Sequence, residues 1–440
     1  MISVIKVPTL REIDESAPVS AVWKRFYEIR CEADLEAYGH TEYLPKTVEE
    51  YRHRYAVPEM PVYTNDTFLI VKDVGAGLSV EGDEVGSSLA DGDASLSSEG
   101  GDAGSTLQGG DAGSYGKVSD VSNSLSFEEV NLNLILGFLV YSVQIGENLP
   151  DLYHDLYIIP EERRRGYGSA ALNWIRERGL CEGKTRSEIW IPQRITGVQS
   201  GDTRQQTTVE ADADTGSLLS ESSEIAKAAL AVSPGYYFAL KHGYGLDNIE
   251  YQSALELEKE KLTQLYQYYL DLAGVEFSVE VVDFNNLDLA EITEIRNSFE
   301  RDMPSSEGAV LPTYTVEDTR QMYEVMAARG NVNSAVLIRA VNDGLAVAYT
   351  KTSHIAGSSI AHQDATWVHC DYRGRYLSGL AKAANALALL DKGVRRIETE
   401  NESNNHPIIA TNQRFGFRLS GCEADLVSYY RGGSWEPSGS

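Results

Sequence analysis

Cysteine is scarce in this chain. Only four cysteines occur among 440 residues, and no two of them form a CxxC pair. Thiols that are so few and so widely separated indicate neither a zinc-binding cluster nor a disulfide framework. We therefore expect no metal site and four reduced thiols, as in a cytoplasmic protein. The four are Cys31, Cys181, Cys370 and Cys422.

Long hydrophobic runs are also missing. The most apolar stretch covers residues 132–145, about fourteen positions, whereas a membrane-spanning helix needs about 20. Residues 1–15 do not have the apolar core between basic and small residues that marks a secretion signal. We therefore expect a cytoplasmic location and no membrane partner.

Positive charge is in deficit, with 38 Lys and Arg against 66 Asp and Glu and a formal net charge of −28 at pH 7. Nucleic acids and anionic membranes are bound through clustered basic residues, so this balance argues against both as partners. A hydrophobic fraction of 42% and a charged fraction of 24% fit a globular protein. A chain of 440 residues is too long for one ordinary core and predicts two domains.

Two segments have few apolar residues. Residues 75–127 are mostly Gly, Ser, Asp, Ala and Glu, and they contain the sequence GGDAGS twice. Such a segment buries too little apolar surface to offset the loss of chain entropy, so it predicts a disordered insertion. Residues 196–223 are polar and acidic and predict a second disordered, flexible insertion. Two interpretations stay open: a lid or tether for an acceptor, or an expansion of surface loops, which cost little when they lengthen.

Outside the insertions, helical and strand patterns follow the same order in both halves of the chain. In the first half we predict helices at residues 20–30, 168–178 and 236–242, and strands at 67–72, 132–144, 152–159, 187–191 and 251–257. In the second half we predict helices at 289–299, from 315, around 380–387 and at 407–414, and strands at 277–284, 335–341, 345–351, 365–370 and 395–399, before a hairpin through Tyr430.

This mixed order predicts an α+β fold of two tandem domains, each a mixed, partly antiparallel sheet flanked by helices. The predicted N-terminal domain covers residues 1–257 and the C-terminal domain residues 276–432. A linker helix is expected at 258–275, and a tail at 433–440.

The most informative stretch is residues 156–170, LYIIPEERRRGYGSA. A buried strand ends there, a basic loop with glycines follows, and a helix begins. The start of a helix offers unpaired backbone N–H groups and the positive end of the helix dipole. Glycines allow an anion to approach that backbone closely, so the pattern is typical of a pyrophosphate site. Alternatively, the arginines are a solvated surface and the glycines only shape a turn.

In this context, Arg163, Gly166 and Gly168 resemble the acyl-CoA signature of the GNAT superfamily of N-acyltransferases. Residues 366–385 resemble the strand, loop and helix of an actinobacterial branch of the same superfamily. The sequence ETEN at 398–401 and the positions Asn405, Pro407, Asn412 and 415–417 match the downstream strand and helix of that branch. The resemblance covers about 276–431 in the second half, and in the first half one loop plus a segment at 240–244.

The resemblance implies two tandem GNAT-type domains, acetyl-CoA as co-substrate and direct transfer of its acyl group to an amine of a small molecule or peptide. It implies two groups of CoA-binding residues. In the first domain these are Tyr157, Ile158, Arg163, Arg164, Arg165, Gly166, Tyr167, Gly168 and Ser169. In the second they are Trp367, Val368, Arg373, Gly374, Arg375, Tyr376, Leu377, Ser378, Asn405 and Asn412.

Acyl transfer also requires a base that deprotonates the amine. The candidates are Asp364 in the second domain and His154 or Asp155 in the first, with His362 and His406 as similar alternatives. Each is also readily explained as a structural or solvent-facing residue.

Several positions depart from the pattern that the resemblance implies. Tyr376 and Ser378 stand where glycines are usual. The tyrosine that many relatives use as general acid to the departing thiolate is replaced by Ala239 in the first domain and Asn412 in the second. Two hypotheses therefore stay open: an N-acetyltransferase, or a module in which one or both domains only bind acyl-CoA or pack together. We favour one catalytic domain and one degenerate partner.

Overall fold

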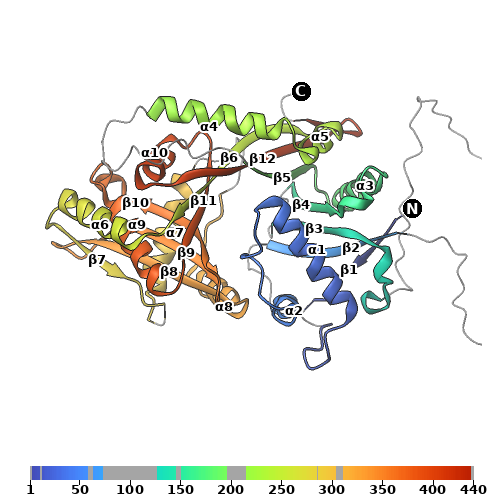
Figure 1. Ribbon diagram of the computed structural model, residues 1–440, viewed down its shortest axis with the longest axis horizontal. Coiled ribbons are helices and arrows are strands. Elements are labelled where there is room, and N and C mark those ends of the chain that lie inside the picture. The colour runs from blue at the N-terminus through green and yellow to red at the C-terminus, as the bar shows by residue number, and fades with distance from the viewer. Residues whose placement is uncertain are drawn as a thin grey trace, which may run out of the picture.

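The computed structural model of the chain describes residues 2–9, 12–57, 63–72, 126–144, 150–195, 215–284, 286–303 and 311–437. Two lobes lie side by side and are bridged by long strands and one long helix (Figure 1). We call β1–β5 with α1–α3 the N-lobe, and β7–β11 with α6–α10 the C-lobe. The bridging elements are α4, α5, β6, β12 and β13.

The elements of each part follow in chain order. The N-lobe contains β1 Ile2–Lys6, α1 Ala21–Ala37, α2 Val48–Ala56, β2 Tyr63–Lys72, β3 Ile135–Gln144, β4 Asp151–Ile158, α3 Tyr167–Cys181 and β5 Arg186–Arg194. The bridging elements are α4 Thr215–Leu230, α5 Pro234–Lys241, β6 Gly245–Glu256, β12 Arg418–Arg431 and β13 Ser434–Pro437. The C-lobe contains α6 Lys259–Ala273, β7 Phe277–Val281, α7 Leu289–Asp302, α8 Val316–Ala328, β8 Asn331–Ala340, β9 Ala346–Ile355, β10 Ile360–Val368, α9 Leu377–Asp391, β11 Arg396–Glu402 and α10 His406–Phe415.

One continuous mixed sheet runs through both lobes in the order β1-β2-β3-β4-β5-β12-β6-β11-β10-β9-β8-β7. Its strand pairs are antiparallel except for β4 with β5 and β10 with β11. The mixed α+β architecture predicted from the sequence is therefore confirmed. The strands do not follow chain order at the junction, because β12 lies between β5 and β6, and β6 pairs with β11. Whether the predicted domain ranges are units of folding stays a prediction.

Helices cover both faces of the sheet. Alternate residues of a strand point to opposite faces, and Leu69 packs with α1 and α2 whereas Ile70 packs with α3. In the C-lobe, Leu337 packs with α7 and Ile338 with α6 and α9. Following the register from strand to strand places α1, α2, α7 and α8 on one face, which we call face A. The opposite face carries α3, α4, α6 and α9, and we call it face B.

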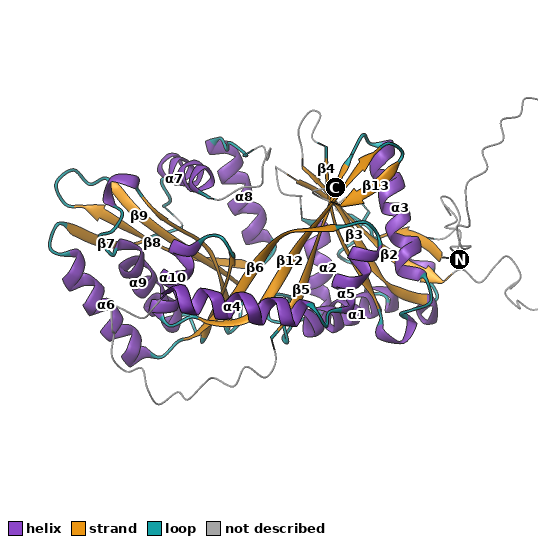
Figure 2. Ribbon diagram, turned by 90° about the horizontal axis from the view of Figure 1, so that it is seen from above, coloured by secondary structure: helices purple, strands orange, loops and turns teal. Residues whose placement is uncertain are grey.

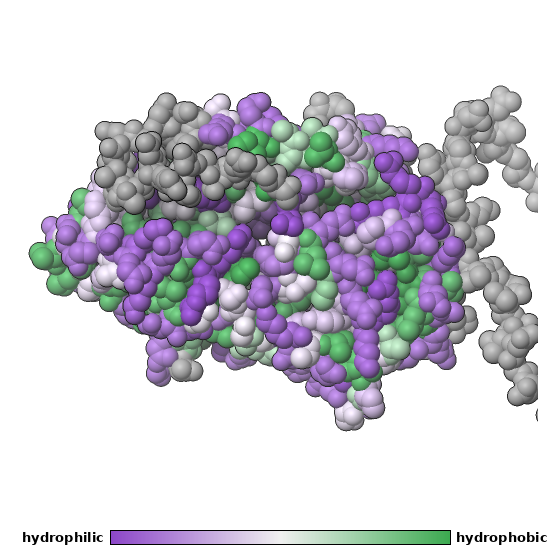
Figure 3. Space-filling model, viewed as in Figure 1, coloured by the Kyte–Doolittle hydropathy of each residue, from purple (hydrophilic) through white to green (hydrophobic). Residues whose placement is uncertain are grey.

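At the centre of the sheet, a described helix covers face B, and no described helix covers face A. There α4 lies along β12, β6 and β5 (Figure 2), and its Ala226 and Leu230 pack on Ile189, Cys422 and Ala424. On face A the corresponding stretch of β5, β12, β6 and β11 lies between α1 of one lobe and α7 of the other. The outer surface mixes hydrophilic and hydrophobic residues over the side seen in Figure 3.

Most of the elements predicted from the sequence are present, with longer bounds. Three elements were missed: β1, α2 and α4. The predicted insertion at 196–223 is wrong from Thr215 on, because α4 begins there. Most of the predicted insertion at 75–127 lies outside the described residues, but Phe127 at its end is buried against Trp23.

Two further features concern helices. Thr315 and Asp318 form the predicted capping box of α8. The predicted linker segment is helix α6, and it packs on α9 in the core of the C-lobe. Among the described residues, no helix has both the length and the apolar character needed to cross a bilayer.

Candidate acyl-CoA and acceptor site

In each lobe, two neighbouring parallel strands are paired at one end and separate toward the other. We call these the parted strands. The recorded pairs of β4 with β5 end at His154 and Ile189, although β4 continues to Ile158. The pairs of β10 with β11 end at His362 and Glu398, although β10 continues to Val368. Beyond these pairs the facing strand edges separate toward the start of the next helix. This opening leaves the backbone groups on the two facing edges unpaired with each other, which suits an extended chain.

The loop after each parted strand has the same backbone path. A short 3-10 turn, Pro160–Glu162 or Cys370–Tyr372, leads to two left-handed residues before α3 or α9. In the N-lobe these are Arg164 at φ 65° and Gly166 at φ 84°; in the C-lobe they are Gly374 at φ 78° and Tyr376 at φ 61°. Each loop therefore carries one glycine and one residue with a side chain in a conformation that costs such residues about 1 kcal/mol or more.

Six successive backbone amides in each loop have no hydrogen-bond acceptor among the described residues. They belong to residues 164–169 and 374–379, and the first helical bonds are donated by Ala170 to Gly166 and by Leu380 to Tyr376. Amides at the start of a helix, together with the helix dipole, form a site for an anion. Both loops therefore have the geometry expected for holding a diphosphate.

Arg163 and Arg373 occupy equivalent positions and fix the loops to their lobes. The Nε of Arg163 donates to the Ile158 carbonyl at 2.8 Å, and its guanidinium pairs with Glu36 of α1. The Nε of Arg373 donates to the Val368 carbonyl at 3.2 Å, and its guanidinium pairs with Asp302 of α7. Both charges are thus matched by carboxylates, which makes the two arginines anchors of the loop rather than free cations for a phosphate.

The remaining arginines of the loops differ in their surroundings. Arg165 pairs with Glu162 at 2.9 Å, and Arg375 pairs with Glu276 at 3.1 Å. Arg164 is exposed and has no ion-pair partner among the described residues. The N-lobe loop therefore offers one uncompensated cation next to its free amides.

Aromatic side chains flank the first turn of each helix. In the N-lobe the Phe238 ring of α5 lies 3.4 Å from where a Cβ on Gly168 would be. In the C-lobe the Tyr269 ring of α6 would come within 2.5 Å of a Cβ on Gly379, so this position requires glycine. Helix α6 thus closes one side of the start of α9.

The strand residues predicted to bind CoA lie at the ends of the parted strands. Tyr157 stacks on Phe138, and Trp367 is buried with its Nε1 3.2 Å from Asp302. The main-chain carbonyls of Ile158 and Val368 accept from the two anchoring arginines. The rings of these strands are therefore part of the packing on face A.

The helix residues predicted to bind CoA divide into packed and accessible ones. Tyr167 packs against the core under α3, and Leu377 is buried under α9. Ser169 shares a hydrogen bond of 2.9 Å with His242, whereas Tyr376 is half-exposed. Ser378 is partly exposed in the first turn of α9.

The downstream residues lie around α10. Asn405 is its N-cap but makes no side-chain cap bond. Asn412 is buried and donates to Asn401 at 2.7 Å, while its own Oδ1 has no partner among the described residues. The equivalent position in the first half of the chain, Ala239 of the bridging helix α5, is fully buried. Neither position holds a phenol that could protonate a thiolate.

His154 is enclosed in the sheet. It is 2% exposed, and its Nε2 lies 2.7 Å from the Tyr244 hydroxyl and 3.1 Å from the Ser187 hydroxyl. Burial, reinforced by the charge of Arg176, lowers the pKa of His154 to about 3. The surroundings make it a neutral, hydrogen-bonded core residue without access for a substrate.

Asp155 points to the other face of β4. It is more than half-exposed, with Arg30 of α1 at 3.7 Å. Asp155 is therefore accessible. It lies in β4 of the N-lobe, whereas Asp364 lies in β10 of the C-lobe, so the structure does not bring the two carboxylates together.

Asp364 lies at a β-bulge in β10, where the register with β9 shifts between Gln363 and Ala365. Its carboxylate pairs with Lys351 and accepts from Ser353 at 2.8 Å. Burial raises its pKa, but the charges of Lys351 and His362 outweigh burial and hold the pKa at about 2. Because its negative charge is paired with Lys351 and His362, the Asp364 carboxylate is a weak base, and it holds these two side chains in place.

The two histidines considered as alternatives differ in setting. His362 lies 3.2 Å from Asp364 and 3.8 Å from Glu400. Burial lowers the pKa of His362, but these two carboxylates raise it to about 10, so its ring is an imidazolium at neutral pH and cannot act as a base. His406 is exposed at the first position of α10.

Sequence reasoning missed a row of carboxylates on face A. Successive strands place acidic residues side by side, with Glu250 opposite both Glu402 and Glu423, and Asp425 opposite Asn248. We call the whole group the acidic strip. It comprises Glu188, Glu250, Glu400, Glu402, Glu423 and Asp425. The signal was present in the sequence as acidic residues at every second position in 398–402 and 423–425, but its extent depends on which strands are neighbours.

Burial and mutual repulsion raise the pKa of several strip carboxylates. Burial, followed by the charges of Glu400 and Glu402, raises the pKa of Glu250 to about 7. Burial and the charge of Glu250 raise the pKa of Asp425 to about 8, and burial with Glu400 raises that of Glu423 as well. A carboxylate with a pKa near 7 suits a general base at neutral pH.

A cavity of about 190 Å³ opens at one end of the strip, where the two lobes meet. Tyr38 and Tyr43 of the N-lobe line it together with Gln252, two carboxylates and two arginines: Glu398, Glu400, Arg194 and Arg396. We call it the inter-lobe cavity. Because Glu398 belongs to the last parallel pair of β10 and β11, the cavity lies beside the point where the two C-lobe strands part.

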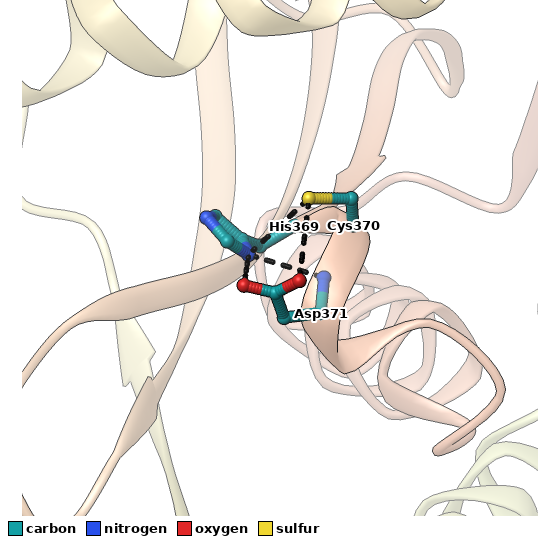
Figure 4. A group of neighbouring side chains, drawn as sticks. All are labelled: His369, Cys370 and Asp371. Carbon is teal, nitrogen blue, oxygen red and sulfur yellow. Dashed lines mark hydrogen bonds and ion pairs between the residues drawn. The ribbon is translucent and has the colours of Figure 1, made fainter.

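Three consecutive residues before the C-lobe loop, His369, Cys370 and Asp371, bring possible metal ligands together (Figure 4). The Nδ1 of His369 already accepts from the Asp371 amide at 3.3 Å and so caps the short turn. A structural zinc site needs four ligands, and the described part of the chain adds no fourth one to this group. We assign no metal to it.

Comparison with known proteins gives matches in structure alone. No family model matches the chain, and no curated protein matches it in sequence. A tandem GNAT protein from the clavulanic acid biosynthesis pathway is similar in fold, with a TM-score of 0.58, 15% identity and 98% of each chain covered.

A second structure of similar fold is a fungal multi-domain GH3 β-N-acetylglucosaminidase with a GCN5-related glucosamine N-acetyltransferase region. Its TM-score is 0.50 and its identity 10%, and the match covers 97% of this chain but 38% of that one. The chain therefore has a tandem GNAT fold, as its sequence motifs predicted.

Proposed function

We propose that the protein is an acyl-CoA-dependent N-acyltransferase that moves an acetyl group from acetyl-CoA to an amine by direct transfer. The observation that carries the proposal is the repeated combination of a parted parallel strand pair and a helix start with six free amides. The opening suits the extended thioester arm, and the amides suit the diphosphate. The tandem GNAT fold supports acyl transfer in general.

In the proposed reaction the amine first loses a proton to a base. Its nitrogen then attacks the thioester carbonyl carbon, a C–N bond forms and the C–S bond breaks. The proton that the nitrogen loses as it becomes an amide passes to the departing thiolate, and CoA leaves as a thiol. A backbone N–H at the edge of the parted strand β10 would polarise the carbonyl. We assign the base to Glu250, whose pKa of about 7 fits the task better than that of Asp364. Asp364 positions His362 and Lys351.

We assign catalysis to the C-lobe. The inter-lobe cavity opens beside the parting of its strands, whereas His154 in the N-lobe is enclosed. The N-lobe loop with its free Arg164 is proposed to bind acyl-CoA. A cytoplasmic location stays a prediction.

A non-catalytic acyl-CoA-binding or structural module is the second candidate. One observation favours it: neither Ala239 nor Asn412 can act as the phenolic acid. On this alternative one or both lobes would bind acetyl-CoA without releasing thiol.

Calorimetric titration with acetyl-CoA tests the binding sites. Gly166 and Gly374 are left-handed, and a Cβ on either meets nothing within 4 Å. Aspartate tolerates this conformation better than most residues and would repel a diphosphate. We expect Gly166→Asp to abolish binding by the N-lobe and Gly374→Asp to abolish binding by the C-lobe.

Matched controls lie at the other ends of the same helices. Gly183 and Gly393 are also left-handed and open, so Gly183→Asp and Gly393→Asp should bind as the wild type does. Thiol release with a panel of amines then separates enzyme from binding module. Absence of acetyl-CoA binding by the wild-type chain refutes both candidates that involve CoA.

A further inference from the structure

Helix α9 carries a lysine in the core of the C-lobe. Lys382 is 3% exposed and lies between the helix and face B of the sheet. Among the described residues its only hydrogen-bond acceptor is the Oε1 of Gln363, at 3.4 Å, and the Phe417 ring lies 5.5 Å from its Nζ. A buried ammonium group without a carboxylate partner destabilises the fold, which makes Lys382 a candidate for a functional role.

Gln363 fixes where this ammonium group lies. It directly follows the last parallel pair of β10 with β11, so it marks the closed end of the opening between the parted strands. Its Nε2 donates to the main-chain carbonyls of Lys351 at 2.6 Å and Ala365 at 2.8 Å. Because carbonyls only accept, the amide of Gln363 has one orientation, with its Oε1 toward Lys382. The ammonium group is therefore held at the closed end.

The proposed path of acetyl-CoA ends at the same place. The diphosphate would lie on the free amides of residues 374–379, at the open end of the parted strands. The thioester arm would run from there back along β10, where the stretch from Val368 to Gln363 spans about 16 Å. The thioester is at the far end of the arm, so this path brings its sulfur toward Lys382.

The two lobes differ at this point. Helices α3 and α9 are both 15 residues long and begin after equivalent left-handed residues. Lys382 is the sixth residue of α9, whereas the sixth residue of α3 is Leu172, which is fully buried in an apolar cluster. The buried ammonium group thus belongs to the lobe to which we assign catalysis, and an apolar side chain takes its place in the other lobe.

Buried amide oxygens without donors lie in the same part of the C-lobe. The Phe417 amide donates to the Asn412 carbonyl at 3.0 Å, and the side chain of Asn412 donates to Asn401 of β11. The Oδ1 of Asn412 and that of Asn385, one turn after Lys382, have no partner among the described residues. Native proteins satisfy nearly all buried acceptors, so these oxygens indicate that a polar ligand group or water enters here.

Burial alone lowers the pKa of Lys382 to about 7. The titratable groups on the elements packed against α9 lie elsewhere: Tyr269 of α6 packs at Gly379, and the ion pair of Lys351 with Asp364 lies on face A. A thiol has a pKa of about 8.5. The ammonium group is therefore a stronger acid than a thiol, and it can protonate a thiolate.

We propose that Lys382 is the general acid of the C-lobe and protonates the thiolate of CoA as it leaves. This inference rests on the proposed N-acyltransferase function and supplies the acid that Asn412 cannot provide. As the C–S bond breaks, the Lys382 ammonium group gives one proton to the sulfur and becomes a neutral amine. The proton that the acceptor nitrogen loses on becoming an amide then restores the ammonium group. One proton thus passes from nitrogen to sulfur, and Lys382 ends as it began.

Labelling of the full chain with bromoacetyl-CoA near pH 7 tests the position of the amine. The neutral Nζ attacks the carbon that carries bromine, an N–C bond forms, bromide leaves and the proton goes to solvent. We expect peptide mass spectrometry to find one adduct on Lys382, prevented by excess acetyl-CoA, and none on Lys392 at the other end of α9. A wild-type chain that binds acetyl-CoA but carries no label on Lys382 overturns the inference.

Turnover tests the role of the amine. We expect Lys382→Met to lower kcat about 100-fold or more and to leave the KM for acetyl-CoA unchanged. The wild-type kcat should fall as the pH rises above about 7, because the acid loses its proton, and this fall should be missing from Lys382→Met. Lys392→Met makes the same change at an exposed position and should behave as the wild type does. A loss of kcat that is equal at every pH indicates a structural role and refutes the acid.

Failure of the proposed function has a different result. If the wild-type chain binds no acetyl-CoA, or releases no thiol with any amine, the enzyme is refuted and the inference falls with it. Thiol release at the wild-type rate by Lys382→Met refutes the inference alone.

Discussion

At the scale of residues, the surroundings decide what a side chain can do. His154 and Asp155 are neighbours in sequence, yet one is enclosed under Tyr244 and the other faces α1 and solvent, because successive strand residues point to opposite faces. Asp364 and Glu250 are both carboxylates on face A, but matched cations lower the pKa of one while burial and repulsion raise that of the other.

The first prediction concerns His154. His154→Phe removes its hydrogen bonds to Tyr244 and Ser187, which lose a buried partner. We expect the free energy of unfolding to fall by about 1–3 kcal/mol, with thiol release per folded molecule unchanged. Urea unfolding and acetyl-CoA turnover measure the two quantities. A variant of normal stability that no longer releases thiol would restore His154 as a candidate base.

The second prediction concerns Gly379. In Gly379→Ala the new methyl group overlaps the Tyr269 ring, so we expect a loss of about 1–3 kcal/mol of stability. Ser378→Ala, at the preceding position, is the control and should cost less than about 1 kcal/mol. The cost of Gly379→Ala should largely disappear in a Tyr269→Ala background, because the two residues are in contact. Additive losses would show that the contact is not the cause.

At the scale of elements, β6 and β12 create the site. Each strand alternates between an apolar side under α4 and an acidic side on face A: Ala424 and Leu426 point one way, Glu423 and Asp425 the other. Because β6 pairs with β12 on one side and with β11 on the other, carboxylates that are about 150 residues or more apart in the chain come together. The repulsion between carboxylates that adds to burial in raising the pKa of Glu250 arises because these strands are close together in the sheet.

The third prediction is a pH dependence. The pKa of Glu250 is about 7 in the folded chain against a usual 4.5, so the folded chain holds an extra proton between these pH values. Its contribution to stability is therefore present at low pH and lost as the pH rises through about 7. We expect Glu250→Gln to match the wild type near pH 4.5 and to be more stable by about 1–2 kcal/mol above pH 7.5, after allowing for partial contact with water.

Chemical unfolding at several pH values measures this difference. The charged groups that act on Glu250 lie on both neighbouring strands and on the strands beyond them: Glu400 and Glu402 on β11, Glu423 and Asp425 on β12, Glu188 on β5 and His362 on β10. Glu294→Gln is the control, since Glu294 lies on the exposed side of α7. A stability difference that does not change with pH would contradict the raised pKa.

At the scale of the whole molecule, the two lobes share one sheet. Strand β12 closes the edge of β5, and β6 closes the edge of β11. Each lobe thus depends on a bridging strand for its last hydrogen-bonded neighbour, and segment 38–43 adds contacts across the junction.

The fourth prediction follows from this shared sheet. We expect a single cooperative transition in scanning calorimetry, with agreement between the calorimetric and van't Hoff enthalpies. Binding of acetyl-CoA to either lobe should shift the whole transition upward. Two separate transitions, of which only one responds to Gly166→Asp or Gly374→Asp, would show that the lobes unfold independently.

The sequence by itself determined the order of most elements, with β1, α2 and α4 as exceptions, and the two loops at the starts of α3 and α9. These depend on local causes: periodic apolar residues, a capping box at Thr315, and residues near Gly166 and Gly374 that must turn the chain between a strand and a helix. It also led to the tandem GNAT fold through motifs that are contiguous in the chain.

The tertiary structure alone decided which strands are neighbours and which face each residue takes. Residues far apart in sequence meet in three places: where β12 lies between β5 and β6, in the acidic strip, and in the inter-lobe cavity. Burial and electrostatic repulsion act between neighbours in space, so the enclosure of His154, the matched charge of Asp364 and the raised pKa of Glu250 could not be read from the chain alone.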